Sequence, residues 1–260
     1  MDKPLEINKQ DHLAWLTLYE TTISDEFQKE FSKALEELAQ DNSIRVLLIK
    51  SAHEKIYFAG ANLNRMSKGF AEADMSALRA ALWDVTALMD SLEAFPKPII
   101  AVVNGYAMGG GCEFCIACDL IIASDKAVFG FPEVKRGLIP SAGGTIRLPR
   151  LIGKHRAMDL LLTGRNVSAQ EAYQIGMINQ VVSPDGLIEE AKKIGRLIAE
   201  NAPIAVRCVK HSVIDTESIF DTKFSNAVVD LSLNHCLKSQ DLIEGVIAFR
   251  EKRKPVFKGE

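Results

Sequence analysis

Cysteine is scarce in this chain of 260 residues, and long apolar runs are missing. The five cysteines are an odd number, and the first six residues (MDKPLE) contain no apolar stretch of a secretory signal, so we expect no disulfide framework. The longest apolar runs, such as residues 99–103, are far too short to span a bilayer. We therefore expect a soluble cytoplasmic protein with no membrane partner.

An excess of basic charge is also absent. The chain has 31 Lys and Arg residues against 34 Asp and Glu residues, a formal net charge of -3. No general positive field recruits nucleic acid, so we expect no nucleic-acid partner. The 47% of hydrophobic residues is enough to bury a core, and the length fits one large domain or a main domain with a smaller appendage.

Several motifs of nucleotide-binding proteins and serine hydrolases are missing. The glycine run at residues 109–111 is not followed by the Gly-Lys-Ser/Thr of a P-loop. Counted from Gly109, the last position of a Gly-x-Gly-x-x-Gly fingerprint is Phe114. No Gly-x-Ser-x-Gly elbow surrounds Ser141, and the five histidines fall in no recognisable motif.

Three of the cysteines have a spacing found in metal sites. Cys112, Cys115 and Cys118 follow the Cys-x-x-Cys-x-x-Cys pattern of part of an iron–sulfur or zinc motif. No fourth Cys or His follows nearby at ligand spacing. The three lie on a predicted buried helix, where free Cys behaves as a small hydrophobic residue. We therefore expect no metal and no bound cofactor.

The spacing of apolar residues predicts alternating strands and helices up to residue 131 and mostly helices after it. Strands are predicted at 12–19, 46–50, 99–103, 120–123, 127–131 and 178–182, and a loop at 51–68. Helices are predicted at 24–39, 74–95, 109–117, 142–151, 154–162, 168–174, 187–200, 203–213, 220–237 and 240–253. The fold class is α/β, with a core domain at residues 1–195 and a helical region at 196–260.

Two glutamates stand out because they lie in strongly apolar stretches. Glu113 follows the glycine run, and Glu133 follows Phe131-Pro132. A buried charge is costly unless it has a partner or a function. A carboxylate pair beside open backbone amides suits acid/base chemistry on a carbonyl compound. The alternatives are a helix-end charge neutralised by the helix dipole for Glu113 and an ordinary turn residue for Glu133.

The glycine run itself has two interpretations. Glycine allows a strand and a helix to pack closely, which is a structural reason for the run. Alternatively, the Gly110 amide is one donor of an oxyanion site, which needs a second donor. The small residues at 58–63 offer that second donor, because they let a substrate touch the backbone.

Several motifs, taken in order, resemble those of the enoyl-CoA hydratase/isomerase (crotonase) superfamily over almost the whole chain. They are residues 58–63 (FAGANL), 103–113 (VNGYAMGGGCE), 131–133 (FPE), 137–140 (GLIP), 143–145 (GGT), 147–150 (RLPR), 162–164 (LTG), 244–245 (EG) and 248–253 (AFREKR). The resemblance implies a spiral of ββα units followed by a helical region. It also implies an acyl-CoA thioester as substrate, with coenzyme A as part of that substrate, and a homo-oligomer that is a trimer or a dimer of trimers.

The resemblance also implies roles for individual residues. The amides of Ala61 and Gly110 would form the oxyanion hole. Further contacts with the substrate or its coenzyme A are implied for Ala59, Ala61, Leu63, Ser141, Phe249 and Lys252. Of these, Phe249 and Lys252 match positions that close the coenzyme A site, often from an adjacent subunit.

Both glutamates are present in hydratases of the superfamily, whereas simple isomerases generally keep only the one that matches Glu133. The resemblance therefore implies hydration of an α,β-unsaturated acyl-CoA to a 3-hydroxyacyl-CoA, or the reverse dehydration. Glu133 would exchange the Cα proton and Glu113 would activate water. The alternatives are isomerisation, hydrolysis or ring opening of a cyclic acyl-CoA, and a non-enzymatic RNA-binding or scaffold function.

Three segments depart from the pattern of the superfamily. Residues 19–24 (YETTIS) replace the usual first turn with Arg-Pro and Asn-Ala-Leu, which contributes to coenzyme A binding. Asn62 replaces the usual Asp, and Ser141 replaces a Gly near the catalytic water. These departures favour a non-standard acyl group, for example a cyclic or branched one.

Overall fold

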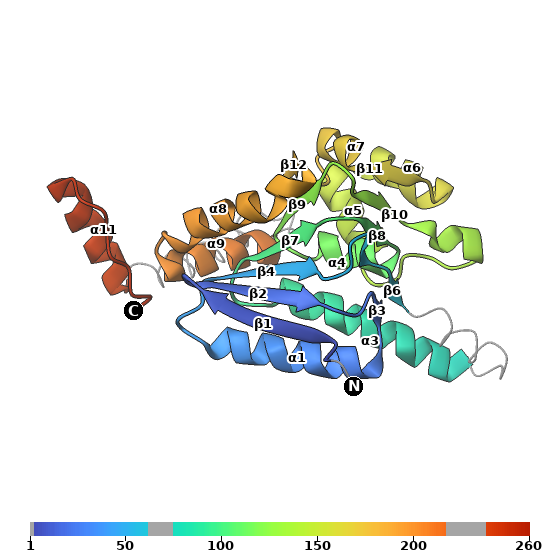
Figure 1. Cartoon of the computed structure of the whole chain (residues 1–260), viewed down its shortest axis with the longest axis horizontal. Coiled ribbons are helices and arrows are strands. Elements are labelled where there is room, and N and C mark those ends of the chain that lie inside the picture. Colours follow the sequence, from blue (N-terminus) through green and yellow to red (C-terminus); the bar gives the residue numbers. More distant parts are fainter. Residues whose placement is uncertain (1–2, 62–74, 217–237) are drawn as a thin grey trace.

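The computed structural model describes residues 3–61, 75–216 and 238–260. Its largest sheet has six strands in the order β1-β2-β4-β7-β9-β12 (Figure 1). These strands are β1 (Leu5–Gln10), β2 (Leu13–Leu18), β4 (Val46–Ser51), β7 (Ile99–Val103), β9 (Leu120–Ser124) and β12 (Gln180–Val182). The β1–β2 pair is antiparallel, and every other neighbouring pair in this sheet is parallel.

Shorter strands form two smaller sheets beside the large one. A four-stranded sheet has the order β11-β10-β8-β5, and β3 pairs with β6 in a separate two-stranded sheet. These strands are β3 (Thr22–Ile23), β5 (Ile56–Phe58), β6 (Gly60–Ala61), β8 (Tyr106–Met108), β10 (Val128–Gly130) and β11 (Asn166–Ser168). Each of the strands β2, β4, β7 and β9 is thus followed by a short strand in another sheet.

Helices complete these units and continue beyond them. They are α1 (Asp25–Gln40), α3 (Met75–Glu93), α4 (Gly110–Ile116), α5 (Gly144–Ile152), α6 (Lys154–Thr163), α7 (Ala169–Gln174), α8 (Leu187–Ala199), α9 (Pro203–Thr216) and α11 (Gln240–Glu251), with the short helices η1 (Pro132–Arg136) and η2 (Pro184–Gly186). The orders β2-β3-α1, β7-β8-α4 and β9-β10-η1 are ββα units of a spiral. The predicted α/β class and ββα units are confirmed.

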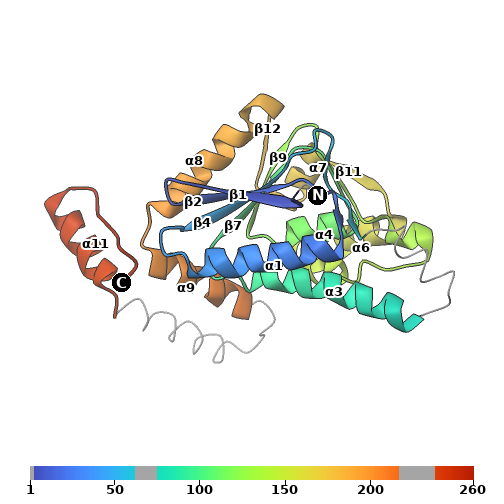
Figure 2. The same cartoon turned by 60° about the horizontal axis from the view of Figure 1, so that its bottom comes forward.

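The hydrophobic core lies on both faces of the large sheet. All five residues of β7 are buried, as expected for a parallel strand covered on both sides. On one face, the rings of Phe27, Phe31, Phe58 and Phe114 stack beneath α1, α3 and α4. The other face is covered by α8, and Figure 2 shows α8 and the α1–α3 pair on opposite sides of the strands.

Some predicted elements differ from the observed ones. The predicted loop at 51–68 contains β5 and β6, and β1 was not predicted. Leu5 is the one buried residue of this edge strand, so its sequence has little of the sustained alternation of apolar and polar residues that indicates a strand. The predicted helix at 220–237 lies outside the described residues. The expected division at residue 195 stays a prediction.

Two lysines connect the helix α9 to the interior. Lys210 is buried and its Nζ lies 2.8 Å from Asp119 Oδ2, which also accepts a hydrogen bond from the Ile99 amide at 2.7 Å. The same Nζ donates to the Lys97 carbonyl at 3.1 Å. Lys97 in turn donates to two carbonyl oxygens at the end of α1. One chain of polar contacts therefore joins α9, the sheet and α1.

Candidate active site

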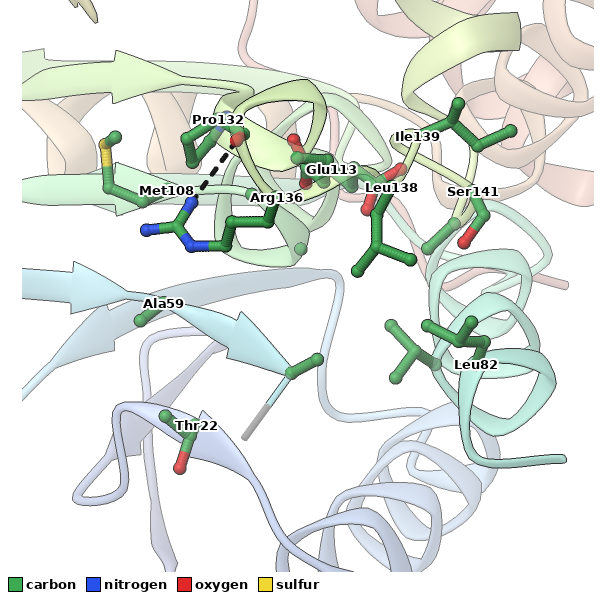
Figure 3. Close-up of a pocket in the computed structure, with 16 residues that line it drawn as sticks. Thr22, Ala59, Leu82, Met108, Glu113, Pro132, Arg136, Leu138, Ile139 and Ser141 are labelled. Carbon is green, nitrogen blue, oxygen red and sulfur yellow. Dashed lines mark hydrogen bonds between the residues drawn. The ribbon is translucent and has the colours of Figure 1, made fainter. Parts of the chain in front are cut away.

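A cavity of about 410 Å³ brings most of the predicted site residues together (Figure 3). Six of them line it: Ala59, Ala61, Gly110, Glu113, Glu133 and Ser141. The opposite wall is apolar and comes from Leu82 and Val85 of α3 and from the loop residues Leu138 and Ile139. Such a volume, with few polar groups in an apolar lining, is typical of a small-molecule site.

The two predicted oxyanion amides come from backbone segments in direct contact. Gly60 has φ +75°, and a Cβ placed on it would overlap the backbone of Gly110. A Cβ placed on Gly110 would lie 3.4 Å from the Ala61 nitrogen. Gly110 is the first residue of α4, where the amide has no partner within the helix. The geometry therefore places the Ala61 and Gly110 backbones at one side of the cavity.

Close approach explains the rest of the glycine run. A Cβ on Gly111 would overlap the carbonyl of Phe58, so only glycine lets α4 pack against the end of β5. Gly109 has φ +56°, and a Cβ there would lie 2.9 Å from Glu133 Oε1. The carboxylate of Glu133 therefore sits directly over the turn that precedes Gly110. Both interpretations of the run, close packing and open backbone at the cavity, fit this geometry.

Glu113 is held inside the protein by a backbone hydrogen bond. Its side chain is only 3% exposed, and Oε1 accepts a hydrogen bond from the Gly144 amide at 2.8 Å. Burial raises the pKa of Glu113 to about 7, and the charge of Glu133 adds to this effect. The amides of Gly144 and Ala142 and the cation of Arg147 oppose it. Glu113 is therefore poised to gain or lose a proton near neutral pH.

Glu133 lies in the first turn of η1, directly after Pro132. Its Oε2 is buried and has no hydrogen-bond partner within the described part of the chain. Burial raises the pKa of Glu133, while the nearby cation of Arg136 lowers it. A buried oxygen without a protein partner is suited to contact a group that enters the cavity.

The two carboxyl groups form an interacting pair. Both line the same cavity, and the charge of Glu133 is one cause of the raised pKa of Glu113. When two carboxyls interact in this way, their protons are released in two steps that belong to the pair. Ionisation of Glu133 therefore disfavours ionisation of Glu113, which suits a site that needs both an acid and a base.

Sequence reasoning assigned no role to two arginines of this region. Arg136 lines the cavity and donates to the Pro132 carbonyl at 3.2 Å, as drawn in Figure 3. Arg147 in α5 is 11% exposed and contacts carboxylates of α3. The sequence feature that points to Arg147 is its charge within the largely uncharged start of α5 (GTIRL). The atypical segment 19–24 also reaches the site, because Thr22 lines the cavity.

Some predicted site residues lie elsewhere. Leu63, Asn62 and the side chain of Phe249 are outside the described part of the chain. Lys252 is exposed, follows the end of α11 and does not line the cavity. Figure 1 shows α11 at the opposite end of the molecule from β6. The expected contact of Lys252 with coenzyme A stays a prediction.

The cysteine run is part of the core. Cys112 and Cys115 are fully buried and free, and burial raises the pKa of both thiols. Among the described residues, no group of three or more His, Cys, Asp and Glu side chains is arranged to hold a metal ion. No helix in the described ranges is both long enough and apolar enough to cross a membrane.

Comparison with known proteins gives sequence relatives over the whole chain. The family model described as enoyl-CoA hydratase/isomerase matches residues 10–260. The short-chain-enoyl-CoA hydratase of Clostridium acetobutylicum is 36% identical over 235 residues, which cover 87% of this chain and 85% of the relative. The 2,3-dehydroadipyl-CoA hydratase of Escherichia coli is 34% identical over 260 residues, which cover 98% of each protein.

Solved structures agree with these relatives. A crystal structure of enoyl-CoA hydratase from Bacillus anthracis matches with a TM-score of 0.93 at 35% identity, covering 99% of this chain and 100% of the other. A structure of the corresponding protein from Geobacillus kaustophilus also has a TM-score of 0.93, at 31% identity, and covers 100% of this chain and 98% of the other. The crotonase-like spiral that the sequence motifs implied is therefore confirmed. The chain belongs to the enoyl-CoA hydratase/isomerase family.

Proposed function

We propose that this protein adds water to the double bond of an α,β-unsaturated acyl-CoA thioester, giving a 3-hydroxyacyl-CoA, and catalyses the reverse dehydration. One observation carries the proposal: two carboxyl groups, Glu113 and Glu133, line the same cavity as the backbone of Ala61 and Gly110. The names of the hydratase relatives support the same reaction.

The backbone would stabilise the charge that develops during the reaction. When water adds to Cβ, negative charge moves to the thioester oxygen and an enolate forms. The Ala61 and Gly110 amides would donate hydrogen bonds to this oxygen. One such donor is typically worth roughly 3 to 4 kcal/mol of transition-state stabilisation.

The two glutamates would move the protons. The carboxylate of Glu113 takes one proton from water as the water oxygen bonds to Cβ, and the carboxylic acid of Glu133 gives one proton to Cα. The Gly144 amide, which donates to Oε1 of Glu113, would keep the carboxylate in place for this transfer. One proton enters the pair and one leaves it, so the pair again carries one proton after each turnover.

The other residues that line the cavity would determine which acyl chain it accepts. The apolar wall of Leu82, Val85, Leu138 and Ile139 favours an apolar acyl chain. Ser141 adds a hydroxyl at the rim of this wall, where the family pattern has glycine. The loop that contains Ala59 would hold the coenzyme A portion.

We include assembly in the proposal. Lys252 lies far from the cavity of its own chain, so its expected role in closing the coenzyme A site needs a second copy of the protein. A homotrimer or a dimer of trimers would supply that copy. In such an assembly, the site is complete only between subunits.

A panel of enoyl-CoA thioesters with linear, branched and cyclic acyl groups tests the proposed reaction. We expect the wild type to consume the absorbance of the conjugated thioester. Glu113→Gln and Glu133→Gln should each lower kcat by about 10² to 10⁴, the usual contribution of a positioned acid or base. Glu190→Gln is a matched control, because Glu190 pairs with Lys193 on α8, away from the cavity.

Three outcomes would contradict the proposal. Wild-type activity in Glu113→Gln would rule out the hydratase mechanism. Migration of the double bond without addition of water, with Glu133 alone required, would indicate an isomerase. Binding of RNA without binding of any thioester would favour the scaffold function.

A further inference from the structure

Arg147 joins the segment that enters α5 to the end of α3. Its guanidinium donates from Nη2 to Asp90 Oδ1 at 2.8 Å and from Nε to Glu93 Oε2 at 3.1 Å. A third nitrogen, Nη1, donates to the Ala142 carbonyl at 3.2 Å. The side chain is only 11% exposed, so these contacts are largely shielded from water. Only arginine offers donors in this forked arrangement.

The segment that Arg147 holds is the one that contacts Glu113. Gly144 donates its amide to Glu113 Oε1, and the Ala142 amide acts on the same carboxylate. Between them, Gly143 has φ +110°, and a Cβ on it would overlap the guanidinium of Arg147. The arginine therefore lies directly against the backbone turn that presents both amides.

We propose that Arg147 is a positioning residue for Glu113: it ties the turn of Ala142, Gly143 and Gly144 to α3 and thereby keeps the Gly144 amide on the carboxylate. This inference rests on the proposed function, since it assumes that Glu113 activates water. Arg147 does not line the cavity and has no contact with the reacting atoms, so it acts through the backbone.

The same contacts link the two walls of the cavity. The helix α3 supplies Leu82 and Val85 to the apolar wall and, about two turns further along, Asp90 and Glu93 to Arg147. Loss of the arginine would therefore free the turn from α3 and leave two carboxylates without their cation.

Charge adds to the positional effect. Three groups face Glu113: Glu133 from η1, Arg147 from α5 and the neutral Cys112 from its own helix. Arg136 faces Glu133. The carboxylates of Asp90 and Glu93 on α3 balance the charge of Arg147. The cation of Arg147 lowers the pKa of Glu113, against burial and the charge of Glu133. Removal of the cation moves the singly protonated state of the pair to higher pH.

The test compares Arg147→Gln and Arg147→Lys with Arg165→Gln. Arg165 also pairs with two carboxylates, Asp159 and Glu171, but lies outside the cavity lining. Arg147→Gln should lower kcat by about 10²-fold, the usual effect of a small misplacement at the reacting atoms, with a much smaller change in KM. Its bell-shaped pH profile should move to higher pH, whereas Arg165→Gln should match the wild type.

Arg147→Lys separates position from charge. Lysine keeps the positive charge, so the pH profile should return toward that of the wild type. It lacks the several N–H donors of the guanidinium group, so kcat should recover only in part. If Arg147→Gln does not fold, a kcat of Arg147→Lys equal to that of the wild type would overturn the proposal.

The role of Arg147 can also be tested without substrate, by a measurement that does not depend on the proposed reaction. Infrared difference titration of the carboxyl groups measures the pKa of Glu113 in the free enzyme. The band of Glu113 is identified by its absence in Glu113→Gln. We expect this pKa to rise in Arg147→Gln and not in Arg165→Gln. A folded Arg147→Gln with an unchanged Glu113 pKa and unchanged kcat would refute the positioning role. Full activity of Glu113→Gln would instead refute the proposed function.

Discussion

Glu113 is a residue whose chemistry opposes the stability of the fold. Burial raises its pKa from the ordinary value of 4.5 to about 7. Between these two pH values, the folded state binds more protons than the unfolded state, so stability falls as pH rises through this range. Below pH 4.5 the group is protonated in both states and the penalty disappears.

Replacement of this carboxyl should therefore stabilise the protein in a pH-dependent way. Glu113→Gln keeps an oxygen for the Gly144 amide but carries no charge. We expect a gain of up to about 3 kcal/mol in the free energy of unfolding at pH 8, and little gain at pH 4.5. Urea unfolding at both pH values measures the difference. Equal effects at both pH values, or a gain of the same size in the surface control Glu190→Gln, would contradict this explanation.

Arg147 shows why part of the site escaped sequence reasoning at this scale. Glu113 and Glu133 were predictable because a charge in an apolar stretch is visible in one local window. The partners of Arg147 are 54 and 57 residues away in the chain, so no local pattern connects them. The motif that contains Arg147 was recognised, but its contacts with α3 appear only in the folded structure.

At the scale of elements, the contact between β6 and α4 brings together the two backbone amides that we propose as oxyanion donors. A Cβ on Gly60 would overlap the backbone of Gly110, and backbone does not yield as a flexible side chain does. Gly60→Ala should therefore push β6 from α4 and lower kcat by about 10² to 10³, the cost of losing one oxyanion donor. Steady-state kinetics on the best thioester measures this loss.

Gly176 provides the matched control for this substitution. It also has a positive φ, +81°, but a Cβ there would meet nothing within 4 Å. Gly176→Ala should cost about 1 to 2 kcal/mol of stability from backbone conformation alone and leave kcat unchanged. Similar kcat values for the two variants would show that the close approach is not required for catalysis.

The predictability of the elements follows their length. The helix α1 was predictable because Phe27, Phe31, Leu35 and Leu38 repeat at helical spacing over about three turns. In contrast, β5, β6 and β8 have two or three residues each and are too short to show any period. They exist because neighbouring segments pair with them, which is a property of the tertiary structure.

At the scale of the whole molecule, α9 is anchored by a buried charge. Lys210 pairs with Asp119 below the surface and donates to the Lys97 carbonyl. Lys210→Met would leave the carboxylate without its cation, and breaking such a pair from one side typically costs about 3 to 5 kcal/mol. We expect a loss of this size in urea unfolding.

The exposed pair of Lys193 and Glu190 is the control for this prediction. Lys193→Met removes an equivalent cation from the surface of α8 and should change stability by less than about 1 kcal/mol. An equally small effect of Lys210→Met would show that α9 is not held to the core by this contact.

The spiral also assigns the reactive groups to successive turns of the chain. Ala61 follows the second long strand of the parallel series, Gly110 and Glu113 follow the third, and Glu133 follows the fourth. In the proposed mechanism, the donors to the thioester oxygen and the group that would protonate Cα therefore come from different stretches of the sequence. A change confined to the stretch of Glu133 would therefore alter the proposed Cα proton donor and leave both amide donors in place, whereas Glu113 shares its stretch with Gly110.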